Sequence, residues 1–216
     1  MSRIVDPIDE KRRCYIKFTG VNMILGITGG VGAGKSSVLA ILQEEYHAKL
    51  ILADEVGREL MQPGEANYVN IVNAFGKEIL NEDQTINTKK LASVAFSNPL
   101  ETLRLNAMTH PNVRVRIEWM IKEIRDKEPD ALIVIEAALL SEGHLTPLCD
   151  DVWYIYADEN TRIERIMASR GYSYERCKQT IARQKSDAQF RAECNVVIDN
   201  SKSLEETKKQ IDNAMR

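Results

Sequence analysis

Short apolar runs alternate with amphipathic stretches along most of the chain. Runs rich in β-branched residues indicate buried strands, and apolar residues spaced three and four apart indicate helices that pack on a sheet. Five strands are predicted, at residues 23–28, 49–52, 131–136, 151–156 and 195–200. Because helical stretches separate them, the pattern predicts an α/β fold with a five-stranded parallel sheet and helices on both faces.

One long stretch shows helical periodicity and no strand pattern. It runs from residue 66 to residue 128, with a break expected at His110-Pro111 because proline is unfavourable inside a helix. We therefore expect a helical substrate subdomain over about residues 62–128, inserted between the second and third strands. Side-chain caps of the predicted helices are expected at Thr88, Asn160 and Ser203.

The phosphate-loop pattern G-x-x-x-x-G-K-[ST] occurs at Gly29-Gly30-Val31-Gly32-Ala33-Gly34-Lys35-Ser36. It joins the first predicted strand to a helix over 37–46, which is the context that the motif requires. Backbone N–H groups of such a loop hold phosphate oxygens, helped by the helix dipole. Lys35 is expected at the β- and γ-phosphates, and the Ser36 hydroxyl at Mg²⁺. The expected ATP contacts are Gly30, Val31, Gly32, Ala33, Gly34, Lys35, Ser36 and Ser37.

Two acidic residues follow predicted strands, at the sheet edge where parallel α/β proteins bind ligands. Asp54 follows the second strand, where it can meet a substrate hydroxyl, cap a helix over 55–61, or do both. Glu136 ends the third strand, the place of a carboxylate that binds Mg²⁺ or its water; the alternative is a charge that reaches solvent. His110 either contacts a substrate or packs beside Pro111, and residue chemistry leaves both open.

Basic residues accumulate after the fourth strand, in two or three short helices around Gly171. Phosphoryl transfer requires that the charge on the transferred oxygens be neutralised, commonly by mobile arginines. Arg165 and Arg170 are therefore candidates, with a closing lid over about residues 165–193; the alternative for each is a solvated helix face. The basic residues are Arg162, Arg165, Arg170, Arg176, Lys178, Arg183, Lys185 and Arg191.

The composition argues against several other classes of protein. The net charge of −3 gives no basic footprint for nucleic acid, and the longest apolar run, over 131–140, is interrupted and too short to cross a bilayer. Residues 1–17 lack the apolar core of a signal peptide, and the polar extension over 1–22 is expected to contribute little to function. The four cysteines form no metal or disulfide pattern, so a cytoplasmic protein is expected. They are Cys14, Cys149, Cys177 and Cys194.

The kind of phosphate-loop protein follows from what accompanies the loop. No guanine-reading N-K-x-D follows a late strand, which argues against a GTPase. The chain length, the helical insertion and the late arginines favour a small-molecule kinase with a lid. Kinases of a nucleoside, a shikimate-like acid or a sugar acid remain alternatives, as does a non-catalytic ATP-dependent switch.

The residues after position 22 resemble the dephospho-coenzyme A kinase family over nearly their whole length. The most discriminating match is the A-D segment followed by P-G, since many kinases share the loop. The family usually has D-A-D where this chain has Leu52-Ala53-Asp54, and aspartate and proline at the positions of Glu136 and Ala138. The matching segments are 26–36, 53–59, 62–64, Phe75-Gly76, His110-Pro111, 139–142, Arg183-Gln184 and 197–200.

The resemblance implies a kinase domain over 23–216 that transfers the ATP γ-phosphate to the 3′-hydroxyl of dephospho-CoA, the last step of CoA synthesis. It implies ATP and Mg²⁺ as cofactors and a monomer or weak homo-oligomer. Asp54 would orient or deprotonate the hydroxyl, and Arg170, supported by Arg165, would close over the phosphates. His110 and the 66–128 helices would line the CoA site, with Glu136 also near substrate and Asn200 near the adenine end of ATP.

Overall fold

The computed structural model describes residues 22–216. The expectation for the extension over 1–22 and the thiol of Cys14 therefore lie outside the described residues, apart from position 22 itself. Within the described residues, no helix is both long enough and apolar enough to span a membrane.

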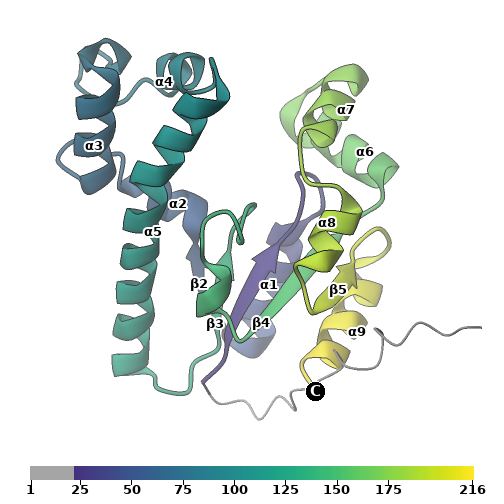
Figure 1. The fold of residues 1–216 in the computed structure, drawn as a ribbon. Coiled ribbons are helices and arrows are strands. Elements are labelled where there is room, and N and C mark those ends of the chain that lie inside the picture. Colours follow the sequence, from purple (N-terminus) through teal and green to yellow (C-terminus); the bar gives the residue numbers. More distant parts are fainter. Residues whose placement is uncertain (1–21) are drawn as a thin grey trace, which may run out of the picture.

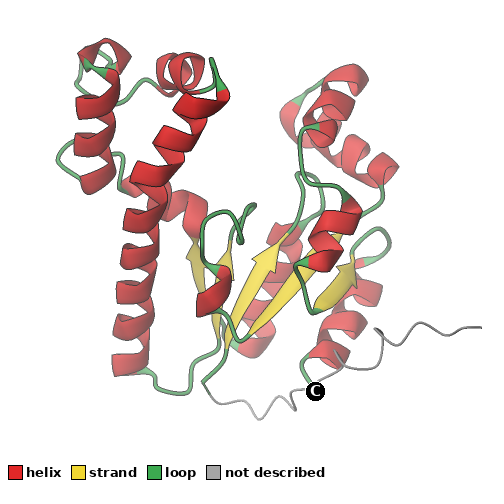
Figure 2. Ribbon diagram, viewed as in Figure 1, coloured by secondary structure: helices red, strands yellow, loops and turns green. Residues whose placement is uncertain are grey.

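The centre of the molecule is a sheet of five parallel strands, as predicted (Figure 2). The strands are β1 (Ile24–Thr28), β2 (Lys49–Leu52), β3 (Ile133–Glu136), β4 (Asp151–Tyr156) and β5 (Val196–Asp199). Their order across the sheet is β2-β3-β1-β4-β5. Strand β3, which follows the helical insertion in sequence, thus lies between the first two strands, and its neighbours share their carboxyl edge with it.

Helices cover both faces of the sheet (Figure 1). On one face, α1 (Lys35–Tyr46) and α9 (Leu204–Ala214) bury apolar side chains against β1, β4 and β5. On the other face, α2 (Ala53–Glu59) and the second half of α5 (Pro99–Lys127) pack on β2 and β3. Burying apolar side chains on each face is the main force that fixes the elements relative to one another.

The inserted helices have a core of their own at the carboxyl edge of the sheet. Helices α3 (Ala66–Phe75) and α4 (Thr88–Ala95), with the short turn η1 (Lys77–Ile79), pack against the first half of α5. The side chains of α5 change partners along the helix, from this core to the face of the sheet. The buried residues of the separate core are Ile71, Ile79, Leu80, Ile86, Leu91 and Ala95.

A second group of helices follows β4 and stands on the opposite side of the same edge (Figure 1). It begins with α6 (Glu159–Arg170) and α7 (Tyr174–Ala182), which pack through a small cluster of Ile163, Ile166 and Cys177. Helix α8 (Asp187–Ala192) returns the chain toward β5 (Val196–Asp199). The connection between β3 and β4 carries the turn η2 (Thr146–Leu148).

The break expected at His110-Pro111 is wrong, because α5 runs unbroken through both residues. Proline removes one backbone hydrogen bond, and the long helix changes direction about midway in Figure 1, as such a residue commonly causes. The two halves of the helix pack in two different cores, and this packing outweighs the local preference. Side chains also bond to backbone carbonyls here, with Thr109 donating to Leu105 O at 2.8 Å.

Two of the three expected helix caps are displaced toward the N-terminus. Asn87, not Thr88, caps α4 and accepts bonds from two backbone N–H groups. Asp158, not Asn160, caps α6. In both cases a residue one or two positions earlier is also a strong capping type, and propensity alone did not separate them. The third expected cap, Ser203, is confirmed.

The cap expected at Asp54 is also wrong. Helix α2 begins at Ala53, directly after β2, and its N-cap position is Leu52 without a side-chain bond. Asp54 therefore lies in the first turn, where its charge is favourable near the helix N-terminus but its carboxylate is not used as a cap. This leaves the functional interpretation of Asp54.

Candidate active site

The phosphate loop has the backbone that its glycines allow. Gly32 and Gly34 have φ of 77° and 84°, in the left-handed region that other residues rarely adopt. A Cβ at Gly34 would also overlap the Asn200 side chain. Helix α1 begins at Lys35, directly after Gly34, so the N–H groups of Lys35 and Ser36 have no carbonyl partner within the helix, whereas that of Ser37 donates to Gly34 O at 3.1 Å. This arrangement can hold a phosphate group.

The Lys35 ammonium lies inside the loop. Its Nζ donates to Gly29 O at 2.8 Å and lies 3.4 Å from Glu136 Oε1. Both side chains are largely buried, with 17% and 13% of their area exposed. The ion pair therefore joins the loop after β1 to the end of β3, and it fixes the lysine where an incoming phosphate would meet it.

Glu136 occupies the position between the loop and Asp54. In the sheet it pairs with Ile27 of β1 on one side and with Leu52 of β2 on the other. Burial raises the pKa of the Glu136 carboxyl, and the charge of Asp54 raises it further, while the Lys35 ammonium acts in the opposite direction. A bound cation would offset this unfavourable burial of charge.

Asp54 lies two residues beyond Leu52, across β3 from the phosphate loop. Two strand spacings separate their strands, which is about 10 Å. The Asp54 side chain is exposed, and no ion pair or hydrogen bond engages its carboxylate among residues 22–216. A carboxylate in this state is available to accept a proton or a hydrogen bond from a ligand.

Two cavities meet around these acids. The loop pocket, of about 690 Å³, is bordered by Lys35, Ser36, Glu136, Arg165 and Arg170, among others. The Asp54 pocket, of about 450 Å³, lies between α2, the first half of α5 and the connection after β3; its walls are mostly apolar. Gly30, Val31, Gly32, Gly34 and Ser37 also line the loop pocket, whereas Ala33 is buried beneath it.

His110 lines the same pocket as Asp54. Its Nδ1 lies 3.1 Å from the backbone oxygen of Glu142. Because a carbonyl oxygen only accepts, Nδ1 carries the proton and the other ring nitrogen is left free in the neutral ring. The contact also ties α5 to the connection after β3.

Arg165 and Asn200 lie behind the loop. Arg165 donates to the carbonyl of Ala33 at 3.3 Å and to that of Asn200 at 2.9 Å. The buried Asn200 amide donates to Ala33 O at 2.9 Å and accepts from Thr207 at 2.8 Å. Both side chains therefore brace the loop through backbone carbonyls and occupy none of its N–H groups.

The loop is also held by two residues, Gln184 and Arg162, that the sequence did not indicate as part of the site. Gln184 accepts from Val31 N at 3.1 Å, and Arg162 donates to Val31 O at 2.9 Å. Arg162 also donates to the Gln184 side chain, which closes the network. The available signal was Arg162 within the basic run and Gln184 within the family match, but neither pattern indicated a contact with the loop.

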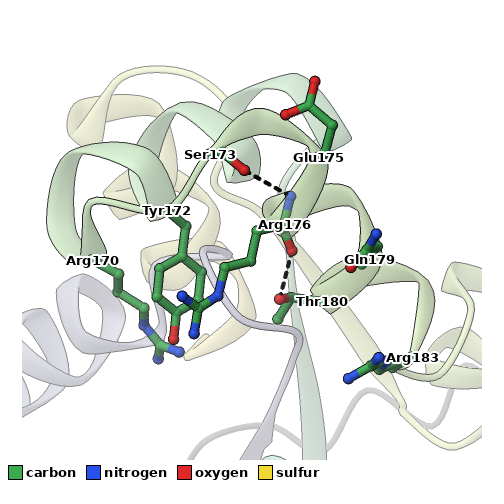
Figure 3. Close-up of a pocket in the computed structure, with 8 residues that line it drawn as sticks. All are labelled: Arg170, Tyr172, Ser173, Glu175, Arg176, Gln179, Thr180 and Arg183. Carbon is green, nitrogen blue, oxygen red and sulfur yellow. Dashed lines mark hydrogen bonds between the residues drawn. The ribbon is translucent and has the colours of Figure 1, made fainter.

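Arg170 ends α6 and borders two cavities, the loop pocket and a lid pocket of about 460 Å³. Figure 3 shows the lid pocket, where the Arg176 guanidinium lies over the Tyr172 ring at 3.7 Å. Within the described residues, no carboxylate forms an ion pair with Arg170, Arg176 or Arg183. Unpaired guanidinium groups around one pocket favour an anionic ligand.

The comparisons with known proteins agree with this geometry. Residues 23–206 match the family model for dephospho-CoA kinase. The curated dephospho-CoA kinase of Carboxydothermus hydrogenoformans is 39% identical over 87% of this chain and 90% of its own. That of Geobacter sulfurreducens is also 39% identical, over 88% and 95%.

Solved structures support the same fold. The crystal structure of TT1252 from Thermus thermophilus aligns with a TM-score of 0.74 and 25% identity, covering 90% of this chain and 97% of that one. A dephospho-CoA kinase from Campylobacter jejuni aligns with a TM-score of 0.63 and 23% identity, over 89% and 94%, and shows the fold alone. With the matched family model and these relatives, the chain belongs to the dephospho-CoA kinase family and is a kinase of the phosphate-loop fold.

Proposed function

We propose that the site transfers the γ-phosphate of ATP to the 3′-hydroxyl of the ribose of dephospho-CoA, which completes coenzyme A. The observation that carries this proposal is the strand order β2-β3-β1. It puts the phosphate loop and the free Asp54 carboxylate on either side of Glu136, with a separate cavity at each. A donor and an acceptor bound in the two cavities would meet above β3.

The loop pocket would hold ATP. Backbone N–H groups over 30–37 would bind its β- and γ-phosphates, and Lys35 would bridge them. To do so, the Lys35 ammonium keeps its position beside Glu136 and adds phosphate oxygens to its contacts. Asn200 would act through the loop backbone, near the adenine end. Catalysis in this pocket consists of positioning and of neutralising charge.

The Asp54 pocket would hold the acceptor. The Asp54 carboxylate would accept a hydrogen bond from the 3′-hydroxyl and take its proton as the oxygen attacks the γ-phosphorus in line. The bond from the γ-phosphorus to the bridging oxygen breaks, and ADP leaves with the electron pair. His110 would contact the acceptor through the ring nitrogen not used by Glu142 O.

The residues between the pockets fit a magnesium ion that arrives with ATP. Ser36 and Glu136 offer oxygen ligands at the loop pocket, the kind that Mg²⁺ prefers. Among residues 22–216 no cluster of three His, Cys, Asp or Glu side chains could hold a metal by itself, so phosphates and water would complete the site. The ion would neutralise charge on the phosphate oxygens.

Two helical groups would close on the ligands. We propose that residues 62–128 form the substrate subdomain and that residues 165–193 form the lid, carrying Arg170 over the phosphates. The separate cores of the two groups support this division. The second half of α5, however, packs on the sheet and belongs to the rigid base.

We also propose a cytoplasmic location and a monomer or weak homo-oligomer. Cys149, Cys177 and Cys194 are free thiols, as a reducing cytoplasm would keep them. One chain lines both pockets, so a monomer or weak homo-oligomer suffices for the reaction.

A coupled ADP assay over a panel of acceptors tests the proposed function. Dephospho-CoA should be turned over, and a nucleoside, shikimate and gluconate should not. Lys35→Ala should abolish turnover, because it removes the cation at the transferred phosphate. Preference for another acceptor would identify a different kinase, and tight ATP binding without turnover of any acceptor would favour the switch.

A further inference from the structure

We propose that Asn67 is a specificity-determining residue, whose side-chain amide donates a hydrogen bond to the nucleotide half of the acceptor. The inference rests on the proposed function, because it assigns a role within the Asp54 pocket. Asn67 lies in the first turn of α3 and lines this pocket together with Asp54. Its residue surface is only 1% exposed, which is unusual for a polar side chain.

A neighbouring amide fixes which way Asn67 faces. Asn112 on α5 donates through Nδ2 to Asn67 Oδ1 at 2.8 Å and to Met108 O at 3.2 Å. Because a carbonyl oxygen only accepts, the second contact fixes the orientation of the Asn112 amide. The first contact then fixes Asn67, whose oxygen is used and whose two N–H groups remain.

Those N–H groups face the pocket. No protein atom among the described residues accepts a bond from Asn67 Nδ2. The sole buried side-chain nitrogen or oxygen left without a partner in this part of the chain is Arg125 Nη2. Asn67 Nδ2 is therefore accessible, and we infer that it is accessible from the Asp54 pocket, which Asn67 lines.

Three other polar side chains that line the pocket already have partners within the protein. Thr109 donates to Leu105 O, and His110 bonds to Glu142 O. Arg58 donates to Asp54 O and pairs with Glu55. Asn67 Nδ2 is thus a rigidly held donor at the wall of the pocket that an acceptor atom of a ligand can use.

The chemistry of the acceptor narrows what Asn67 would bind. The reacting ribose must lie at Asp54, so the groups nearest to it in the pocket belong to the nucleotide half of dephospho-CoA. That half presents ring nitrogens and phosphate oxygens, which accept hydrogen bonds. A site built to donate to such an atom discriminates strongly against ligands that lack it.

The test compares three variants by steady-state kinetics on dephospho-CoA. Asn67→Asp keeps the side-chain shape and the bond from Asn112 but replaces the donor with a charged acceptor. Asn67→Ala removes the whole amide. The control is Asn70→Ala on the same helix, since Asn70 also bonds to Met108 O but does not line the pocket.

The KM for dephospho-CoA should rise about 10-fold in Asn67→Ala and more in Asn67→Asp, while the KM for ATP stays within about two-fold. Asn70→Ala should leave both constants near those of the wild type. The assignment is overturned if the KM for dephospho-CoA in both Asn67 variants equals the KM in Asn70→Ala. If the wild type itself fails to phosphorylate dephospho-CoA, the proposed function fails instead, so the two failures are distinguishable.

Discussion

At the scale of single residues, the two acids at the sheet edge have different surroundings, and for this reason we propose different roles for them. Glu136 is buried and paired with Lys35, whereas Asp54 is exposed and unpaired within the described residues. A proton acceptor must be free to approach the hydroxyl, and a group that organises cations need not be. The division of roles thus follows from burial and pairing, not from residue type.

Asp54→Asn should lower kcat about 10²-fold, because an amide cannot take the hydroxyl proton. The KM for ATP should stay within about two-fold, since Asp54 lines the other pocket. Steady-state kinetics with both substrates varied would measure this. Glu55→Gln, at the neighbouring exposed acid, is the control and should retain most activity. A near-normal kcat in Asp54→Asn would remove the proposed role as base.

Glu136→Gln should make the protein more stable at neutral pH while lowering its activity. The raised pKa of Glu136 means that the folded protein binds its proton more tightly than the unfolded chain does. Its ionised form therefore costs stability above the raised pKa, and this cost disappears as the pH falls toward the ordinary value of 4.5.

The measurement for Glu136→Gln is the difference in Tm between variant and wild type across pH. It should be positive at pH values above the raised pKa of Glu136 and should shrink on acidification toward pH 4.5. Turnover should fall at every pH, because the variant loses the charge that holds Lys35 and a magnesium ligand. A Tm difference that grows on acidification would contradict the assigned direction.

At the scale of elements, the sequence predicted the strands and most helices because their apolar periodicity is strong. Strands β2 and β4, for example, have the predicted bounds. The position of β3 between β1 and β2 was not predicted, since neighbours in a parallel sheet are set by packing of the whole domain. The same reason explains why α5 continues through Pro111. The two halves of this helix pack in two separate cores, and the local sequence pattern does not reveal either packing.

The candidate site, too, was predicted only where its residues are close together in the sequence. The motif predicts the phosphate loop and its helix, since that chemistry is local in sequence. The contacts that Arg162 and Gln184 make with Val31 join segments more than a hundred residues apart, and no spacing rule reveals them. Likewise, the sequence suggested that Arg165 meets phosphate, whereas in the fold its guanidinium donates to the backbone carbonyls of Ala33 and Asn200.

Arg165→Met separates a brace of the loop element from a direct phosphate contact. If Arg165 acts through the loop carbonyls, the affinities for ADP and ATP should fall by the same factor, about 10-fold, because both use the loop. Arg165→Lys should not restore binding, since one ammonium cannot reproduce the forked contacts. Calorimetry with ADP and a non-hydrolysable ATP analogue measures both. A loss confined to the ATP analogue would instead indicate contact with the γ-phosphate.

At the scale of the whole molecule, the helical insertion (α3 to α5) and the proposed lid (α6 and α7) lie at the carboxyl edge of one sheet. A single segment connects them there. The connection after β3 bonds to α5 through His110 and to the base of the lid through Lys185, which contacts Ser141 at 2.7 Å and Glu193 at 2.8 Å. Movement of the lid would therefore displace the connection after β3, which also lines the Asp54 pocket. This arrangement allows acceptor binding and lid closure to influence each other.

Arg170→Ala tests closure of the lid over the phosphates. Because Arg170 borders both the loop pocket and the lid pocket, its guanidinium can reach the transferred group when α6 and α7 move inward. The kcat should fall about 10³-fold, as when other phosphoryl-transfer enzymes lose an arginine that stabilises the transition state. ADP affinity should change within about two-fold, since ADP lacks the γ-phosphate.

The matched control for Arg170 is Arg191→Ala, because Arg191 lies in the same proposed lid but pairs with Asp187 at 2.8 Å and borders neither pocket. Its kcat should stay near that of the wild type. Equal losses of kcat and ADP affinity in Arg170→Ala would mean that the residue supports the loop rather than the moving phosphate. Proteolysis of α6–α7 should in addition slow on binding a non-hydrolysable ATP analogue in the wild type, and less so in Arg170→Ala, because the variant lacks the contact that we propose between the lid and the γ-phosphate.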